Sequence, residues 1–452
     1  MAHKATRIDL FSLRTPAMRA FHLTWMAFFV CFFAWFACAP LMPLIKREFG
    51  LSADQVANIN IAAVAVTILV RLVVGPMCDR YGPRKVYSGL LLAGALPVLG
   101  AAVSTGYGSF LLCRLLIGAV GASFVITQYH TSMMFAPNVV GTANATTAGW
   151  GNTGAGAAQA LIPLLLAAIV VLGVGESSAW RVALVVPGLA MPVMAAFYWR
   201  FTQDCPQGNF AALRAQGIAI DGGKKGGWAS FRAACANYRV WMLFITYAAC
   251  FGVEVFIHNI AAIYYVDHFQ LSLKEAGMAA GSFGLLALFA RALGGWVSDK
   301  AAASRGLEVR STLLCALIVG EGLGLLCFAH ANSIAPALVA MLVFGLFTHM
   351  ACGATYALVP FIDRKALGGV AGIIGAGGNV GAVAAGFLMK GVGGIQQTLA
   401  TLGVLVTLSA LCALAVRFSG EHKAREAALR ERALAAAAAP AAPAANTQGM
   451  AN

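Results

Sequence analysis

Two arginines stand at matching places in two similar segments of this 452-residue chain. Arg71 and Arg291 each open the pattern Arg-x3-Gly-x3-Asp, which ends at Asp79 and Asp299, and each follows a long apolar run. A charged side chain inside a bilayer is costly, so an arginine there points to a functional site. Its guanidinium stays protonated and offers a planar fork of donors that fits a small planar oxyanion. We therefore predict that Arg71 and Arg291 form one central anion site.

The depth of the two arginines supports a role beyond orientation. Each lies eight residues before its aspartate, about 12 Å along a helix at 1.5 Å per residue. That depth makes it hard for the charge to reach the interface. No acidic partner is evident deep in either segment, so we expect both arginines to be available to an anion. The alternative is a structural arginine bound to helix-end carbonyls or to an aspartate.

The composition places these arginines in a membrane protein. Hydrophobic residues make up 60% of the chain, charged residues only 11%, and the mean hydropathy is +0.79; soluble domains carry about 25% charge. The formal net charge of +14 could suggest nucleic acid as a partner. Because the charges fall mostly in short loops and tails, we assign them to membrane orientation instead and expect no nucleic-acid partner.

The apolar runs predict an all-α protein of twelve transmembrane helices, each long enough to cross a bilayer. With both termini in the cytoplasm, the inner segments hold 23 Lys and Arg residues and the outer segments hold five, which fits the positive-inside rule. We predict a multi-pass protein of the cell membrane. The predicted spans are 21–45, 54–78, 86–104, 109–136, 140–172, 180–201, 240–266, 276–298, 311–330, 334–358, 366–390 and 396–417.

A second internal repeat divides these spans into two bundles of six. The segment from Gly151-Asn152 in the fifth span matches the segment from Gly378-Asn379 in the eleventh. Parallel repeats of six spans are typical of the major facilitator fold, whose substrate sites lie near the midplane between the halves. We predict an N-terminal bundle over 1–201, a cytoplasmic linker over 202–239, a C-terminal bundle over 240–417 and a partly disordered cytoplasmic tail over 418–452.

The repeated asparagines are further candidates for the anion site. Asn152 and Asn379 lie on helix faces that also carry small residues, and we expect their side-chain amides to donate hydrogen bonds to the ligand. The glycines of these faces have an equally good explanation in close helix packing.

The segment that follows the second span carries a gate motif. Gly75-Pro76-Met77-Cys78-Asp79-Arg80-Tyr81-Gly82-Pro83-Arg84-Lys85 resembles the cytoplasmic loop of the major facilitator superfamily, and a shorter echo ends at Asp299. The resemblance implies a gate latch with the aspartate at a helix N-terminus, where a carboxylate is stabilised. The alternative is plain positive-inside charge. The gating candidates are Asp79, Arg80, Arg84 and Asp299.

Nearly the whole chain resembles the nitrate/nitrite porter family, because Gly149-Trp150-Gly151-Asn152 and Gly375-Ala376-Gly377-Gly378-Asn379 are similar to its two nitrate signature segments. The resemblance implies that Arg71, Arg291 and Asn152 bind the anion. It also implies that three aromatic side chains sandwich the anion, although each taken alone fits a packed core as well. These aromatic residues are Phe124, Tyr247 and Phe251.

Energetics shape the expected mechanism. A monovalent anion entering an inside-negative cell works against about 2.3 kcal/mol per 100 mV, so uptake needs proton symport or exchange for an internal anion. The candidates for proton coupling are Glu254 and His349, with His130 and His258 behind them; each also fits a structural role. We predict nitrate uptake with proton symport, as in nitrate assimilation.

Several alternatives stay open. The chain could be a nitrate/nitrite antiporter, a nitrite exporter, or a porter of another small anion such as formate. In another class, it could be a nitrate sensor without transport, although the Ala/Pro-rich tail offers no output domain. No metal, nucleophile or cofactor motif stands out and the eleven cysteines form no cluster, so we expect no enzyme, no cofactor and no metal site. The expected partners of this monomer are nitrate, nitrite, protons and the lipid bilayer.

Overall fold

A computed structural model describes residues 4–136, 139–218, 228–363, 367–424 and 428. The prediction of twelve transmembrane helices is confirmed, because twelve helical segments of this part are long and apolar enough to cross a membrane. They are Pro16–Phe49, Ala53–Arg71, Pro83–Ala102, Tyr107–Met134, Thr142–Val171, Ser177–Phe201, Tyr238–Phe269, Leu273–Ala302, Val309–Ala329, Ile334–Leu358, Gly369–Val392 and Ile395–Ala415.

These spans are built from the following elements, in which η marks a short 3₁₀ helix. The elements are α1 (Pro16–Phe36), η1 (Ala39–Leu41), α2 (Met42–Phe49), α3 (Ala53–Tyr81), α4 (Pro83–Ala102), α5 (Tyr107–Ile117), η2 (Gly118–Ala122), α6 (Ser123–Met134), α7 (Val140–Val171), α8 (Glu176–Phe201), α9 (Phe210–Ala215), α10 (Trp228–Ala236), α11 (Tyr238–Phe269), α12 (Leu273–Leu285), α13 (Ala287–Arg305), α14 (Val309–Ala329), α15 (Ile334–Leu358), η3 (Val359–Phe361), α16 (Leu367–Val392) and α17 (Ile395–Ala415).

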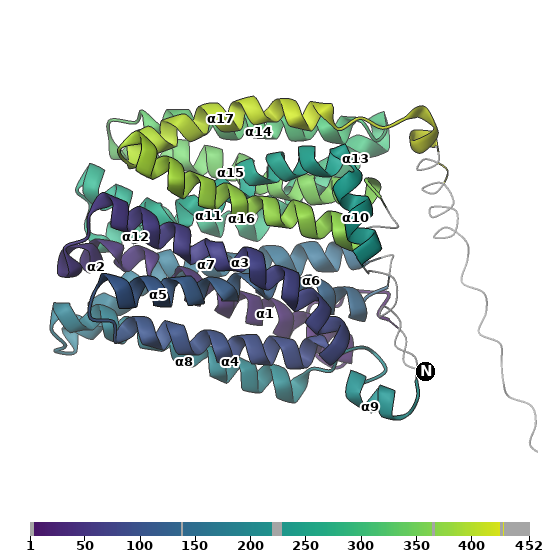
Figure 1. Ribbon diagram of the computed structural model, residues 1–452, viewed down its shortest axis with the longest axis horizontal. Helices are drawn as coiled ribbons and strands as arrows, with labels where there is room; N and C mark the ends of the chain where they lie inside the picture. Colours follow the sequence, from purple (N-terminus) through teal and green to yellow (C-terminus); the bar gives the residue numbers. More distant parts are fainter. Residues whose placement is uncertain (1–3, 137–138, 219–227, 364–366, 425–427, 429–452) are drawn as a thin grey trace, which may run out of the picture.

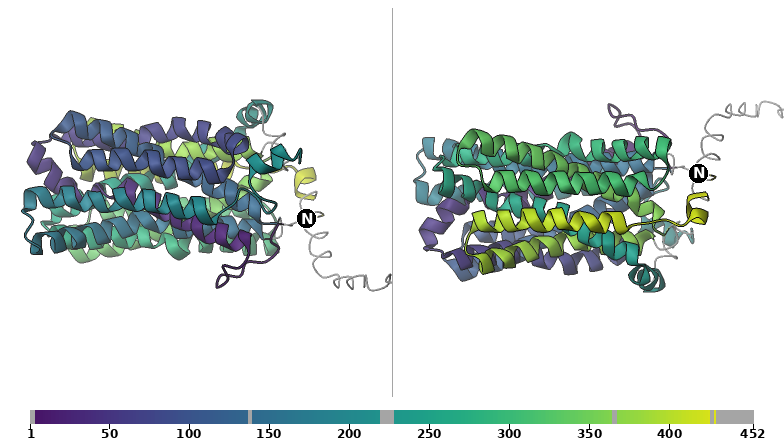
Figure 2. Two further views of the ribbon diagram at one scale, coloured as in Figure 1. Left: turned by 90° about the horizontal axis from the view of Figure 1, so that it is seen from below. Right: turned by 90° about the horizontal axis from the view of Figure 1, so that it is seen from above.

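The helices run side by side in one elongated bundle (Figure 1). Helices α1 to α8 fill the lower part of that view and α11 to α17 most of the upper part. Helix α1 begins and α17 ends at the same end of the bundle, which we call the terminal end; α2 lies at the opposite, far end. The two views of Figure 2 show the same elongated arrangement. The exact domain limits stay a prediction, and the middle of the linker and most of the tail (219–227, 425–427 and 429–452) lie outside the described residues.

The two arginine-bearing segments begin in the same way at the far end. Gly50 and Gln270 both adopt left-handed backbone, with φ of 60° and 57°. Two residues later, Ser52 and Ser272 each open a capping box, in which the serine side chain and the side chain three residues on satisfy each other's backbone N–H groups. The repeat seen around the arginines therefore reaches back to the helix caps, and each arginine stands 19 residues after its capping serine.

Two spans that line the centre lose regular helix there. The fourth span changes to 3₁₀ geometry at η2, and the eighth span is interrupted at Leu286 between α12 and α13. A 3₁₀ stretch in the middle of a helix often marks a functional hinge. Irregular backbone at membrane depth is tolerated where protein or a cavity covers it. The break at η2 lets the backbone carbonyl of Gly121 accept a hydrogen bond from Arg71, and at the second break the carbonyl of Phe283 lies 3.1 Å from His349 Nε2.

Small residues let helices of the first and last six spans pack closely. A Cβ on Gly156 of α7 would lie 2.5 Å from the backbone nitrogen of Leu285, and one on Gly284 would lie 2.6 Å from the Gly156 Cα. Helix α16 approaches α3 in the same manner, since a Cβ on Gly386 would lie 2.5 Å from the Ile61 side chain. Glycine at these contacts removes the side chain that would separate the backbones.

The gate motif folds differently from its prediction. Helix α3 continues to Tyr81, so Asp79 lies in its last turn, and Asp299 lies inside α13. Residues 75–81 of the predicted loop are therefore helical, because α3 extends beyond its apolar run. The gate latch, with its aspartate at a helix N-terminus, stays a prediction. The predicted linker likewise contains two short helices, α9 and α10.

Gly82 makes the turn between α3 and α4 possible. Its φ of 86° suits glycine, and a Cβ there would lie 2.4 Å from the Asp204 carboxylate. That buried carboxylate accepts the backbone N–H groups of Arg84 and Phe210, each at 2.9 Å. We expect Gly82→Ala to lower the unfolding free energy by about 2 kcal/mol, since such backbone strain costs 1–3 kcal/mol. Melting of the detergent-purified protein tests this.

A matched control exists on the next helix. Gly89 in α4 has no heavy atom within 4 Å of its absent Cβ, and alanine favours helix over glycine. Gly89→Ala should therefore melt at or above the wild-type temperature. Equal melting of Gly82→Ala and Gly89→Ala would contradict the assignment of strain to Gly82.

Candidate functional site

Arg71 lies at the centre, between the first and last six spans. Its Nη1 donates to the backbone carbonyl of Gly375 in α16 at 3.0 Å, and its Nη2 donates to that of Gly121 in η2 at 3.3 Å. Its Nε has no hydrogen-bond partner. The guanidinium also lies near the rings of Phe124 and Phe251, at 5.7 and 5.8 Å from their centroids. No carboxylate is paired with Arg71 among the described residues.

Arg291 lies against the same aromatic ring, but it has a different partner. Its guanidinium carbon is 5.5 Å from the Phe251 centroid, so one ring lies beside both arginines. Its Nη2 contacts both carboxylate oxygens of Glu254, at 2.6 and 2.5 Å. The expectation that neither arginine has a deep acidic partner is therefore wrong for Arg291. The partner comes from α11, a helix that the arginine's own segment does not contain.

Glu254 is a fully buried carboxylate with contacts from several helices. Besides Arg291, it accepts a hydrogen bond from Asn152 Nδ2 at 2.7 Å, and Cys352 Sγ lies 3.5 Å away. Asn152, predicted to face the anion, thus donates to this carboxylate. His258 Nε2 lies 4.0 Å from the carboxylate. Arg71, Arg291 and Glu254 together carry one net positive charge, which suits one monovalent anion.

His349 is placed so that it can share a proton with Glu254. Its Nε2 lies 3.1 Å from the carbonyl oxygen of Phe283 and its Nδ1 lies 3.4 Å from Glu254 Oε2. A carbonyl only accepts, so Nε2 carries a hydrogen. A neutral imidazole then turns the lone pair of Nδ1 toward the carboxylate oxygen. The contact between His349 Nδ1 and Glu254 Oε2 is favourable only when a proton lies on the imidazole nitrogen or on the carboxylate.

An aromatic cluster adjoins the two arginines. The rings of Tyr247 and Phe251 stack at 5.2 Å with an interplanar angle of 3°. Tyr356 of α15 packs edge-on against Tyr247 at 5.2 Å and against Phe124 at 5.9 Å. Sequence reasoning missed Tyr356, because it stands in an apolar span without a motif. The three predicted aromatic residues are thus brought together by a fourth.

The other predicted site residues lie apart from this centre or bond within their own helix. Asn379 is buried, its Nδ2 is 3.5 Å from the Gly375 carbonyl of the same helix, and its Oδ1 has no partner. His130 contacts Tyr198 and Thr24 inside the first six spans and belongs to their core.

The gating residues bond within their own halves. Asp299 pairs with Arg310 at 2.7 Å. Arg84 donates from Nε to the carbonyl of Trp199 at 2.7 Å, and the Arg80 guanidinium lies over the ring of Tyr81. The side chain of Asp79 lies outside the described part, so the latch stays a prediction.

A third intramembrane arginine joins the two halves nearby. Arg114 is 1% exposed and donates from Nη1 to the carbonyl of Trp35 at 2.9 Å and from Nη2 to Asn259 Oδ1 at 2.8 Å. These acceptors come from α1 and α11. Hydrogen bonding therefore accounts for Arg114.

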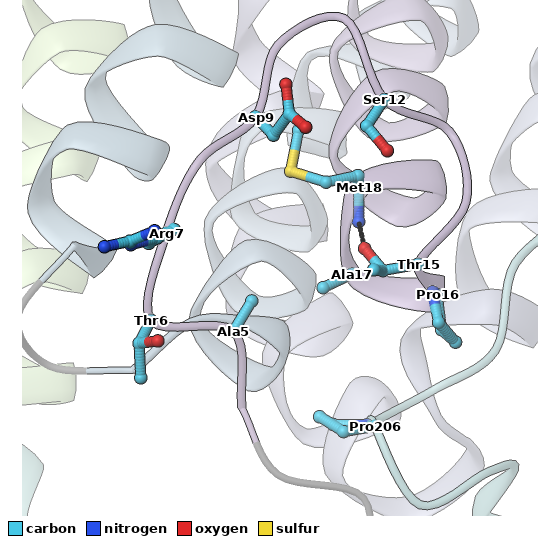
Figure 3. Close-up of a pocket in the computed structure, with 10 residues that line it drawn as sticks. All are labelled: Ala5, Thr6, Arg7, Asp9, Ser12, Thr15, Pro16, Ala17, Met18 and Pro206. Atoms are coloured by element: carbon cyan, nitrogen blue, oxygen red, sulfur yellow. Dashed lines mark hydrogen bonds between the residues drawn. The ribbon is translucent and has the colours of Figure 1, made fainter.

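A surface pocket lies away from the arginines. It has a volume of about 410 Å³ and is formed by the N-terminal segment, the start of α1 and Pro206, as Figure 3 shows. None of the predicted site residues lines it. It gives no reason to move the candidate site from the centre.

Comparisons with known proteins identify the family of this chain. A family model described as the Major Facilitator Superfamily matches residues 24–362. The chain is 41% identical over 385 residues to "High affinity nitrate transporter 2.5" of Arabidopsis thaliana, covering 84% of this chain and 75% of that protein. It is 28% identical over 433 residues to "Nitrate/nitrite transporter NrtP" of Nostoc punctiforme, covering 81% and 85% respectively.

Solved structures give the fold independently. A bacterial homologue of the human lysosomal transporter Spinster, in an inward-facing and unoccupied conformation, superposes with a TM-score of 0.69 at 14% sequence identity. The match covers 90% of this chain and 100% of that one. At this identity, the likeness establishes the fold alone.

Proposed function

The chain belongs to the nitrate/nitrite porter family of the major facilitator superfamily and transports nitrate; on that premise, we propose that it takes up nitrate together with a proton by alternating access. The observation that carries the proposal is the pair of arginines beside one ring, Phe251. One comes from each half of the chain, and one of them is neutralised by Glu254.

The bound anion lies between Arg71 and Arg291 in this proposal. Arginine offers two parallel N–H donors to a flat oxyanion, which lysine cannot do. The rings of Phe124, Tyr247 and Phe251 cover the flat faces and exclude water, and nitrite, which is also small, planar and monovalent, fits the same fork. Asn379, whose Oδ1 has no partner, turns its amide toward the ion when the halves move.

Proton coupling follows from competition for Arg291. An entering anion replaces the Glu254 carboxylate at that guanidinium. The carboxylate then remains buried without its cation, which costs about 3–5 kcal/mol unless it takes a proton. His349 lies within reach to pass that proton. Anion and proton therefore bind together, and their charges cancel, so the roughly 2.3 kcal/mol per 100 mV that opposes an anion alone is removed.

The direction of opening is part of the proposal. The basic residues favour the terminal end as the cytoplasmic one. At the far end, Lys46 pairs with Asp267 at 2.7 Å and Lys390 donates to Asn58 at 3.1 Å, and both contacts join the first six spans to the last six. We propose that these contacts hold the outer side closed, and that they break when the protein opens outward.

Nitrate uptake into proteoliposomes tests the function. The purified protein is reconstituted, and uptake is measured with an inward proton gradient, with no gradient, and with internal nitrite loading. Proton symport predicts uptake that rises with the gradient and needs no internal anion. Uptake that requires internal nitrite and ignores the gradient would establish an antiporter instead. Binding without any uptake would establish a sensor.

A further inference from the structure

A small space beside Arg71 exists because residue 375 is glycine. A Cβ on Gly375 would lie 3.1 Å from the phenol oxygen of Tyr356 and 3.8 Å from Arg71 Nη1. Outside the local helix backbone, no other heavy atom of the described residues lies within 4 Å of that point. A non-bonded oxygen must stand roughly 3 Å from the Gly375 Cα, farther out than a bonded Cβ. An oxygen placed outward from this point toward Tyr356 and Arg71 would lie within hydrogen-bond distance of both donors. The space therefore has the chemistry of an oxyanion subsite.

Packing holds the Tyr356 ring in place. It meets Tyr247 at an angle of 82° and Phe124 at 66°, with centroids 5.2 and 5.9 Å away. Edge-to-face pairs of this kind are favourable beyond their buried area. These contacts come from α6 in one half and α11 in the other. The hydroxyl is thus held at the junction of the halves, where an ion must pass.

We propose that the Tyr356 hydroxyl donates a hydrogen bond to an oxygen of the bound nitrate, which occupies the space over Gly375 with Arg71 Nη1 as its second donor. The inference rests on the proposed function and adds a binding residue to it. A phenol suits this position because it adds a directed donor without adding charge. The charge balance among the arginines, Glu254, the proton and the anion is therefore the same with or without this donor.

Tyr356→Phe removes the hydroxyl and keeps the ring. A hydrogen bond to a charged group contributes enough that its loss weakens binding about tenfold. We expect the KM for nitrate uptake to rise about tenfold, with Vmax changed less than about twofold, in reconstituted protein. The matched control is Tyr265→Phe in α11, whose hydroxyl donates to the Met341 sulfur at 3.4 Å. A KM of Tyr356→Phe equal to that of the wild type overturns the proposal.

Gly375→Ala tests the space itself. Its methyl group would fill the subsite, so nitrate should no longer raise the melting temperature of the purified protein at concentrations that stabilise the wild type. Gly372→Ala is the control on the same helix, because nothing lies within 4 Å of its absent Cβ. If nitrate raises the melting temperature of Gly375→Ala as much as that of the wild type, the proposal is also overturned. Failure of the wild type to take up nitrate would instead overturn the proposed function. That result differs from an unchanged KM in Tyr356→Phe and from unchanged stabilisation of Gly375→Ala by nitrate.

Discussion

Replacing either central arginine with lysine should nearly abolish nitrate uptake. We expect Arg71→Lys and Arg291→Lys to lower the initial rate at least about 100-fold, because loss of a buried charge-paired donor costs 2–5 kcal/mol and each 1.4 kcal/mol is tenfold. Lysine keeps the positive charge but not the planar fork. The measurement is uptake into proteoliposomes at equal protein content.

The two variants should fail for different reasons. Among the described residues, Arg71 donates hydrogen bonds to backbone carbonyls alone, so Arg71→Lys should remove anion binding and leave folding intact. Arg291 also neutralises Glu254, so Arg291→Lys should in addition lower the melting temperature. Normal nitrate transport in both variants would refute the two-arginine site.

Arg181→Lys is the control variant. It tests whether replacing an arginine outside the proposed anion site also lowers nitrate uptake. Arg181 pairs with Glu48 at 2.6 Å and donates to the carbonyl of Ala102 at 3.1 Å. It therefore resembles the central arginines in its bonding but lies outside the proposed site. Its replacement should leave uptake within about threefold of the wild type, as expected for a partly exposed ion pair.

Sequence patterns predicted the fold because they report local physics. Long apolar runs set the twelve spans, and the repeated asparagine segments indicated two related halves. The arginines were found because a charge in an apolar run is conspicuous. The predicted second span, 54–78, lies inside α3, which begins one residue earlier and continues past the apolar run to Tyr81. The first span was predicted less well, because its helical segment, Pro16–Phe49, extends beyond the predicted 21–45 at both ends.

The partners of the arginines could not be predicted in this way. Glu254 precedes Arg291 by 37 positions and reaches it from another helix, so only tertiary packing brings them together. The acceptor carbonyl of Gly121 is available at η2, a local break that hydropathy does not report. The Tyr356 hydroxyl approaches α16 closely at Gly375, where a Cβ would lie 3.1 Å from it. Sequence patterns identify unusual residues, but they do not predict which residues of other helices contact them.

Glu254→Gln should separate nitrate movement from proton movement. The amide cannot take up or release a proton, so an inward proton gradient should no longer raise nitrate uptake. The wild type, with one proton per nitrate, should accumulate up to about tenfold more nitrate for each pH unit of gradient. Nitrate counterflow, which moves labelled nitrate against unlabelled nitrate, needs no net proton and should persist. Both assays use the same proteoliposomes.

A second buried glutamate supplies the control for that variant. Glu321 in α14 is fully buried, but it pairs with no arginine among the described ion pairs. Glu321→Gln should therefore keep its response to the proton gradient. If Glu321→Gln loses that response and Glu254→Gln keeps it, protonation is not linked to the anion through Arg291. Coupling would then depend on a carboxyl group that never competes with nitrate.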